Sequence, residues 1–248
     1  MTEAVIEMIL GAVGDLFIFR KSYNKLKNEK VILPEGFTLT AHTGCEGTAD
    51  NSLEAIKKGY ECGADTVEFD VNFTAEGVPV LAHDKAADST VTLAQAFELI
   101  AELPSLTVNV DCKTTENLRG ISELAEKYGV KDRIFYTGIG EKDVPAVKEQ
   151  TPDITYWLNI KLKKSSDKAY LNSVADKVKA LGAAGLNINH KRCTKELVDF
   201  FHEKGLLVSI WTIKTEFDMI RALNLGPDNI TTRKPGTLRP VIEHKTSN

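Results

Sequence analysis

Cysteine is scarce in this sequence and follows no recognisable pattern. The 248 residues include four cysteines, none of them in CxxC spacing. This argues against a disulfide framework or a zinc site, and it is typical of reduced thiols in a cytoplasmic protein. The net charge is only -4. No basic run is interleaved with aromatic residues and no nucleic-acid motif is present, so we expect no nucleic-acid partner.

The sequence also lacks a long apolar run free of charge. The most apolar stretch, AVIEMILGAVGDLFIF at residues 4–19, is interrupted by Glu7 and Asp15. It is too short and too charged to span a bilayer. Glu3 stands where a secretory signal peptide would carry positive charge. We therefore expect a cytoplasmic protein without a transmembrane segment.

The same stretch has the spacing of an amphipathic helix, and a basic segment follows it. Its apolar side chains recur at Ile6, Ile9 or Leu10, Val13 and Phe17, which is a helical period. We predict that residues 1–36 form an N-terminal helical extension. Such a helix either packs against one end of the folded domain or in a dimer interface, or makes peripheral contact with a membrane. The domain is predicted below to be a barrel, and the end in question is its floor.

Residues 37–248 alternate between β-rich and helix-like segments and show neither a repeat nor a domain boundary. Strands are predicted at 37–42, 65–71, 106–113, 133–139, 154–160, 185–190, 207–213 and 228–232. Helix-like segments, many ending on glycine, lie between most of them. Eight strands alternating with helices predict a single α/β domain, a closed parallel TIM (β/α)8 barrel. An open doubly wound sheet is disfavoured because no glycine-rich phosphate loop follows the first strand.

One strand-like run breaks this alternation. VPVLAHD at 78–84 follows the 65–71 strand after only a few residues, whereas a parallel crossover needs a dozen or more. This run must therefore return antiparallel as a β-hairpin after the second strand. That geometry brings His83 back over the mouth of the barrel.

Charged side chains gather where the predicted strands end, which is where barrel enzymes place their chemistry. Glu68 and Asp70 are two residues apart and so point to the same face of their strand. Two ionised carboxylates this close repel each other and destabilise the fold unless a cation lies between them. A hard divalent ion is the simplest such cation. Asp111 can complete an oxygen site, and Lys113 follows it at the same spacing. His42 and His83 suggest proton transfer beside the metal, because imidazole titrates near neutral pH.

These residues resemble the motifs of the glycerophosphodiester phosphodiesterase family, within the PLC-like phosphodiesterase superfamily. The corresponding segments here are His42-Thr43-Gly44, Asp50-Asn51-Ser52, Glu68-Phe69-Asp70, His83-Asp84, Asp111-Cys112-Lys113 and Trp211-Thr212. Their order and spacing match the family from about Thr40 to Pro235.

The resemblance implies a phosphodiester hydrolase with a catalytic histidine pair, His42 and His83. It implies that Mg or Ca is held by three carboxylates and that substrate is bound by further side chains on the rim. The implied metal ligands are Glu68, Asp70 and Asp111, and the implied substrate contacts are Lys113 and Trp211. The expected reaction converts a glycerophosphodiester into sn-glycerol 3-phosphate and an alcohol. Which histidine is the acid and which the base stays open.

The sequence departs from the family pattern at the phosphate-binding arginine. Thr43 stands in place of that arginine, and a threonine cannot imitate a bidentate guanidinium. We hypothesise that Lys161, Arg233 or Lys234 takes over part of its task. Asp50 and Asp111 are each shorter than the glutamates more common at these positions, and a short connection between His83 and Asp111 predicts an open mouth.

Two alternative functions stay open. A phospholipase D-like enzyme acting on lysophospholipid or sphingolipid at a membrane surface would suit the apolar N-terminal helix. A catalytically weak protein that binds a phosphate ligand would suit the altered His-Thr-Gly turn. In every case we expect a small-molecule or lipid-derived phosphodiester ligand.

Overall fold

The computed structural model describes residues 26–84, 86, 91–164 and 166–247. Nine strands occur in this part of the chain: β1 (Thr38–Ala41), β2 (Thr66–Phe73), β3 (Pro79–Leu81), β4 (Thr107–Cys112), β5 (Ile134–Ile139), β6 (Tyr156–Asn159), β7 (Gly185–Asn189), β8 (Leu207–Ile213) and β9 (Asn229–Thr232). The α-helices between and after them are α2 (Leu53–Glu61), α3 (Leu93–Ala101), α4 (Leu118–Lys127), α5 (Val144–Gln150), α6 (Lys168–Leu181), α7 (Lys195–Glu203), α8 (Glu216–Leu225) and α9 (Pro235–Thr246).

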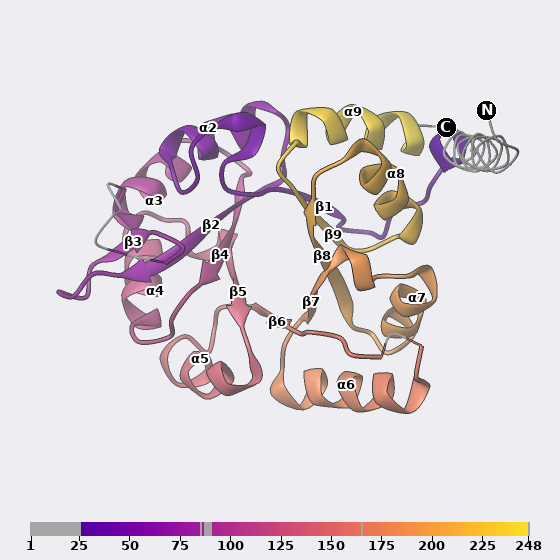
Figure 1. Ribbon diagram of the computed structural model, residues 1–248. Helices are drawn as coiled ribbons and strands as arrows, with labels where there is room; N and C mark the ends of the chain where they lie inside the picture. The colour runs from indigo at the N-terminus through magenta and orange to yellow at the C-terminus, as the bar shows by residue number, and fades with distance from the viewer. Residues whose placement is uncertain (1–25, 85, 87–90, 165, 248) are drawn as a thin grey trace, which may run out of the picture.

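Eight of these strands close into a parallel barrel. The strand order is β1-β9-β8-β7-β6-β5-β4-β2, and β1 also pairs with β2, so that Thr40 lies opposite Thr66. Figure 1 shows the helices arranged as an outer layer around the strands. The predicted (β/α)8 barrel is therefore confirmed. Its closure brings the carboxyl ends of all eight strands to one rim.

The ninth strand, β3, is the predicted hairpin. It pairs antiparallel with β2, so that Val71 lies opposite Leu81 and Phe73 opposite Pro79. Because β3 is added outside the closed barrel, its end at Leu81 points His83 back toward the rim on which β2 also ends.

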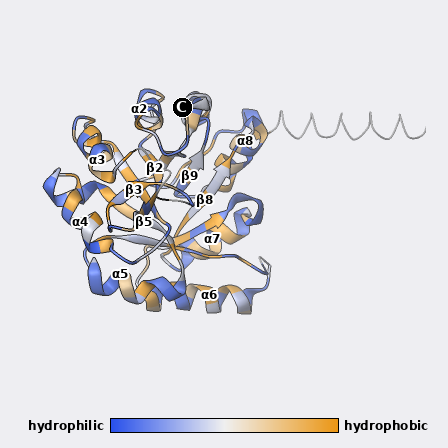
Figure 2. Ribbon diagram, turned by 60° about the vertical axis from the view of Figure 1, so that its left-hand side comes forward, coloured by the Kyte–Doolittle hydropathy of each residue, from blue (hydrophilic) through white to orange (hydrophobic). Residues whose placement is uncertain are grey.

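Alternation along the strands sorts apolar from polar side chains. In β2, Val67, Phe69 and Val71 are buried toward the helical layer. On the other face, Thr66 contacts Thr107 of β4 through a hydroxyl hydrogen bond of 2.6 Å, and Glu68 and Asp70 lie above Thr66 on the same face. In Figure 2 the helices show hydrophilic and hydrophobic faces, as expected for helices that cover a barrel.

The helix starts are set by local capping. Six helices begin after a residue whose side-chain oxygen accepts a backbone N–H of the first turn: Ser52, Thr92, Asn117, Asp167, Thr194 and Thr215. These bonds satisfy donors that the helix itself leaves unpaired. Polar residues between the hydrophobic segments thus set the first turn of these six helices.

The predicted N-terminal helix lies largely outside the described residues, and the division at residue 36 stays a prediction. The described part of that segment lies against the end of the chain. Lys245 in α9 is 1% exposed, and its ammonium donates to the backbone carbonyls of Leu26 and Glu29. Val31 N–H donates to Lys245 O at 3.0 Å. Among the described residues, no helix is long and apolar enough to cross a membrane.

We expect Lys245→Met to lower the free energy of unfolding by about 1–3 kcal/mol. Methionine keeps the volume but leaves the carbonyls of Leu26 and Glu29 without their charged donor. Chemical denaturation measures the change. Lys179→Met, at an exposed position in α6, is the matched control and should stay within about 0.5 kcal/mol. Equal loss in both variants would contradict a specific role for the buried ammonium.

Candidate active site

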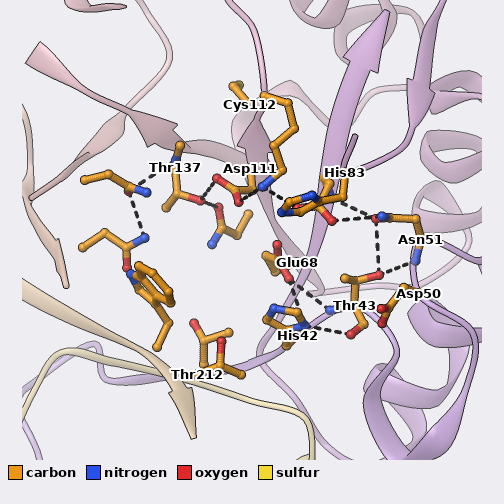
Figure 3. A pocket seen from close by; sticks show the side chains of 18 of the residues that line it. His42, Thr43, Asp50, Asn51, Glu68, His83, Asp111, Cys112, Thr137 and Thr212 are labelled. Carbon is orange, nitrogen blue, oxygen red and sulfur yellow. Dashed lines mark hydrogen bonds and ion pairs between the residues drawn. The ribbon is translucent and has the colours of Figure 1, made fainter. Parts of the chain in front are cut away.

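A cavity of about 590 Å³ opens at the carboxyl ends of the strands. Eight of the ten residues given a role from the sequence line it: His42, Glu68, Asp70, His83, Asp111, Lys113, Trp211 and Arg233. Lys161 and Lys234 do not. The eight lining residues lie within β2, β4 and β8, or in the segments that follow β1, β3, β4 and β9. Figure 3 shows His42, Glu68, His83 and Asp111 around the same space.

Three carboxylates form an oxygen-rich cluster on two adjacent strands. Asp70 of β2 lies directly opposite Asp111 of β4 in the parallel register. Glu68, Asp70 and Asp111 each offer a ligand oxygen, and these atoms lie within 4.8 Å of one another. Burial, and then the charges of Asp70 and Asp111, raise the pKa of Glu68 well above its ordinary value. Such a cluster has the donor chemistry that Mg²⁺ and Ca²⁺ prefer.

Lys113 partly neutralises this cluster. Its ammonium lies 2.7 Å from Asp70 Oδ1 and 2.6 Å from Asp111 Oδ2. Burial alone would lower the pKa of Lys113, but the charges of Asp111 and Asp70 and the hydrogen bonds to them raise it. Lys113 is therefore a permanent cation that shares two carboxylates with any metal ion bound there.

The imidazole ring of His42 is held by a hydrogen bond at one of its two nitrogens, Nδ1. Its Nδ1 lies 2.8 Å from Thr43 O and 3.8 Å from Glu68 Oε2, so Nδ1 carries the proton that the carbonyl accepts and Nε2 is left to accept another. Burial is the main cause of a lowered pKa for His42. A histidine of this kind is neutral at pH 7 and can act as a base.

His83 is also held through its Nδ1, but its side chain is more exposed to solvent than that of His42. Its side chain is 64% exposed, and Nδ1 lies 2.7 Å from Asp84 Oδ1. The carboxylate fixes the ring so that Nε2 is again the nitrogen available for proton exchange. The two histidines thus reach the cavity from a barrel strand and from the added hairpin.

A turn after β1 joins His42 to the carboxylate cluster through Asn51, a residue for which no role was predicted. The Asn51 amide donates to Asp70 Oδ2 at 2.9 Å, while its Oδ1 accepts from Asp70 N at 3.0 Å. Its own N–H donates to Thr43 Oγ1, and Thr43 N donates to Glu68 Oε2 at 3.0 Å. Thr43 therefore holds the turn together. Asn51 was visible in the Asp50-Asn51-Ser52 motif, but only the fold shows its contacts.

The far wall of the cavity is neutral and also escaped the sequence analysis. Four consecutive strands, β4 to β7, contribute Asn109, Thr137, Asn159 and Asn187. Thr137 Oγ1 donates to Asn109 Oδ1 at 2.7 Å, and Asn187 Nδ2 donates to Asn159 Oδ1 at 3.0 Å. The available signal was a polar side chain within each of these otherwise mostly apolar strands.

Two rim residues take other positions. Lys161 lines a neighbouring cavity of about 300 Å³, together with Glu141, Tyr170 and Lys177. Asn159 lines both cavities, so the two adjoin. His190 is buried beside α8, with Nδ1 4.0 Å from Asp218 Oδ1, and it is not among the residues that line the main cavity.

Comparison with known proteins places this barrel among the phosphoric diester hydrolases. The chain belongs to the glycerophosphoryl diester phosphodiesterase family, whose model matches residues 41–122 and 109–237. A glycerophosphodiester phosphodiesterase of Caldanaerobacter subterraneus subsp. tengcongensis is 26% identical over 241 residues, which cover 82% of this chain and 96% of the relative.

Solved structures show the same fold. An Oleispira antarctica phosphodiesterase in complex with the product sn-glycerol-3-phosphate aligns with a TM-score of 0.71 at 20% identity, covering 85% of this chain and 97% of that one. A glycerophosphodiester phosphodiesterase of Agrobacterium tumefaciens aligns with a TM-score of 0.68 at 14% identity, covering 82% and 99%. The fold of this chain is therefore shared with both structures.

Cys45 is close to His42 in sequence, but its environment makes it a poor nucleophile. Its thiol is buried and donates to Ala55 O at 3.4 Å, and burial is the main cause of a pKa raised to about 11. We expect iodoacetamide near pH 8 to label the half-buried Cys62 before Cys45, because only an accessible thiolate reacts. Peptide mass spectrometry gives the order, and faster labelling of Cys45 in the native protein would contradict this account.

Proposed function

We propose that this enzyme hydrolyses glycerophosphodiesters to sn-glycerol 3-phosphate and an alcohol, using a divalent cation and two histidines. The observation that carries the proposal is the joint placement of two anchored imidazoles and three clustered carboxylates on one cavity. The Oleispira relative with bound sn-glycerol-3-phosphate supports the same product class.

The carboxylate cluster fits a hard cation. Three carboxylates with ligand oxygens this close repel one another, and Lys113 forms ion pairs with Asp70 and Asp111 but not with Glu68. Glu68, Asp70 and Asp111 would hold Mg or Ca, which when bound stabilises charge on the phosphoryl oxygens. The ion would compete with the Lys113 ammonium for shared carboxylates. Lys113 is then available to bind a phosphoryl oxygen.

The histidines have distinct tasks in this proposal. His42, with its lowered pKa and unprotonated Nε2, takes a proton from the water molecule that attacks the phosphorus. His83, oriented by Asp84, delivers a proton to the leaving alcohol oxygen. Trp211, 36% exposed on the rim, packs against the substrate. Lys161 contacts only a substrate long enough to reach the adjoining cavity.

The lipid alternative rests on the apolar segment at residues 4–19, which lies outside the described residues. The binding-protein alternative rests on the loss of an arginine at Thr43. No observation in the described part of the chain favours either over hydrolysis of a small glycerophosphodiester. Assays on glycerophosphocholine and lysophosphatidylcholine distinguish glycerophosphodiester hydrolysis from the lipid-directed activity. Binding without turnover on a broad panel of phosphodiesters would select the binding-protein alternative.

We expect His42→Ala and His83→Ala each to lower kcat for glycerophosphocholine by about 10²–10⁴-fold, because each removes a proton-transfer group.

For the wild type, kcat/KM should fall as the pH drops through the pKa of His42, below its ordinary value of 6.5, since the protonated ring cannot act as a base. This acid limb should disappear in His42→Ala. His202→Ala, on α7, is the control. Turnover insensitive to both changes would refute the histidine mechanism.

We expect Glu68→Gln and Asp111→Asn to weaken Mg²⁺ or Ca²⁺ binding by about tenfold or more, because each removes a charged ligand. Titration calorimetry on the purified protein measures this without reference to activity. Asp84→Asn removes an exposed acid outside the cluster and should leave metal affinity unaltered. Equal affinity in all three variants and the wild type would rule out the proposed metal site.

A further inference from the structure

The cavity holds two permanently charged cations in the described part of the chain, and they differ in their partners. Lys113 is engaged by two carboxylates of the candidate metal cluster. Arg233, which follows β9, also lines the cavity. Its partner is Asp50, which is not a member of that cluster. Arg233 is therefore the cation that a metal ion would not have to displace.

Arg233 is fixed at both its backbone and its side chain. Its N–H donates to Ile213 O at 3.4 Å, and its carbonyl accepts from Glu46 N at 2.8 Å. Its guanidinium grips Asp50 in a bidentate pair, with Nη1–Oδ1 at 2.8 Å and Nη2–Oδ2 at 3.2 Å. A guanidinium has five N–H donors, so this pair leaves three for another ligand.

This ion pair lies against the turn that carries the first histidine. A Cβ added to Gly44 would lie 1.9 Å from Asp50 Oδ1 and 2.8 Å from Arg233 Nη1. The absence of a side chain at Gly44 thus lets the pair approach the backbone two residues after His42. Asp50 in turn precedes Asn51, whose amide bonds Asp70. The position of the guanidinium is therefore coupled to His42 through the backbone at Gly44 and to the carboxylate cluster through Asp50 and Asn51.

The other candidates for an anion ligand are less well placed. Thr43 is 3% exposed, and its hydroxyl is occupied by Asn51. Lys161 lines the adjoining cavity, and Lys234 is not among the lining residues of the main one.

We propose that Arg233 binds the non-bridging phosphoryl oxygens of the substrate and that Asp50 is its positioning residue. A guanidinium can donate two parallel N–H bonds to two phosphate oxygens, which an ammonium cannot do. The cation that the His-Thr-Gly turn lacks is thus supplied from the opposite end of the barrel sequence. This assignment deepens the proposed function and rests on it.

The test is calorimetric binding of inorganic phosphate and of sn-glycerol 3-phosphate, with Mg²⁺ present, to the wild type and to four variants. Arg233→Ala should weaken binding of both ligands by about 10–100-fold, and Arg233→Lys should recover only part of the loss. Asp50→Ala should give a smaller loss than Arg233→Ala, because the guanidinium remains but is no longer held. Lys234→Ala, the neighbouring cation, is the control and should bind as the wild type does.

Turnover gives an independent readout. Arg233→Ala should raise KM for glycerophosphocholine more than it lowers kcat, and free guanidinium ion at millimolar concentration should restore part of the loss. Thermal melts establish that the variants are folded. Equal phosphate affinity in the wild type and Arg233→Ala, or no phosphate binding by the wild type, would overturn the assignment. A wild type that binds phosphate through Arg233 but hydrolyses no glycerophosphodiester would instead refute the proposed function.

Discussion

Mutual repulsion among three carboxylates is the constraint on which the rest of the site depends. Parallel pairing of β2 with β4 places Asp70 opposite Asp111, and the two-residue period of β2 adds Glu68 beneath them. Such a cluster is tolerated only where positive charge and hydrogen-bond donors surround it. The structure meets this need from three directions: the Lys113 ammonium, the Asn51 amide and the Thr43 backbone N–H.

These compensating contacts also position the side chains for which we propose catalytic and phosphate-binding roles. The Thr43 N–H that stabilises Glu68 belongs to the residue whose carbonyl orients His42. The Asn51 amide that stabilises Asp70 follows Asp50, which holds Arg233. One short turn after β1 therefore couples the acid cluster, a histidine and a guanidinium. Its conformation is demanding, since Asn51 has a φ of 56°, a region that asparagine enters more readily than most residues.

The barrel and most of the cavity were predictable because they follow from short-range rules. Strand period and connection length gave the eight parallel strands and the returning hairpin, and the carboxyl ends of strands are where parallel barrels gather their functional side chains. The roles of those residues are not fixed by this placement. Two helices have weak sequence signals, because α5 has only seven residues and α9 contains Pro240 within it.

Long-range contacts could not be read from the sequence. Arg233 and Asp50 are 183 residues apart, and nothing in either segment specifies their pairing. Lys161 was expected beside the substrate because it follows a strand, but β6 ends at Asn159. Beyond that point alternation no longer determines which way a side chain faces, and Lys161 turns to the adjoining cavity.

The two histidines belong to parts of the fold that are built under different restraints. His42 follows β1, which is paired on both sides and completes the barrel. His83 follows β3, which pairs with β2 and with an isolated bridge at Thr92. A change in the length or twist of this ribbon would move His83 without disturbing barrel closure. The spacing between the proposed proton donor and acceptor is thus a property that evolution can adjust independently of the fold, and with it the size of the group accommodated between them.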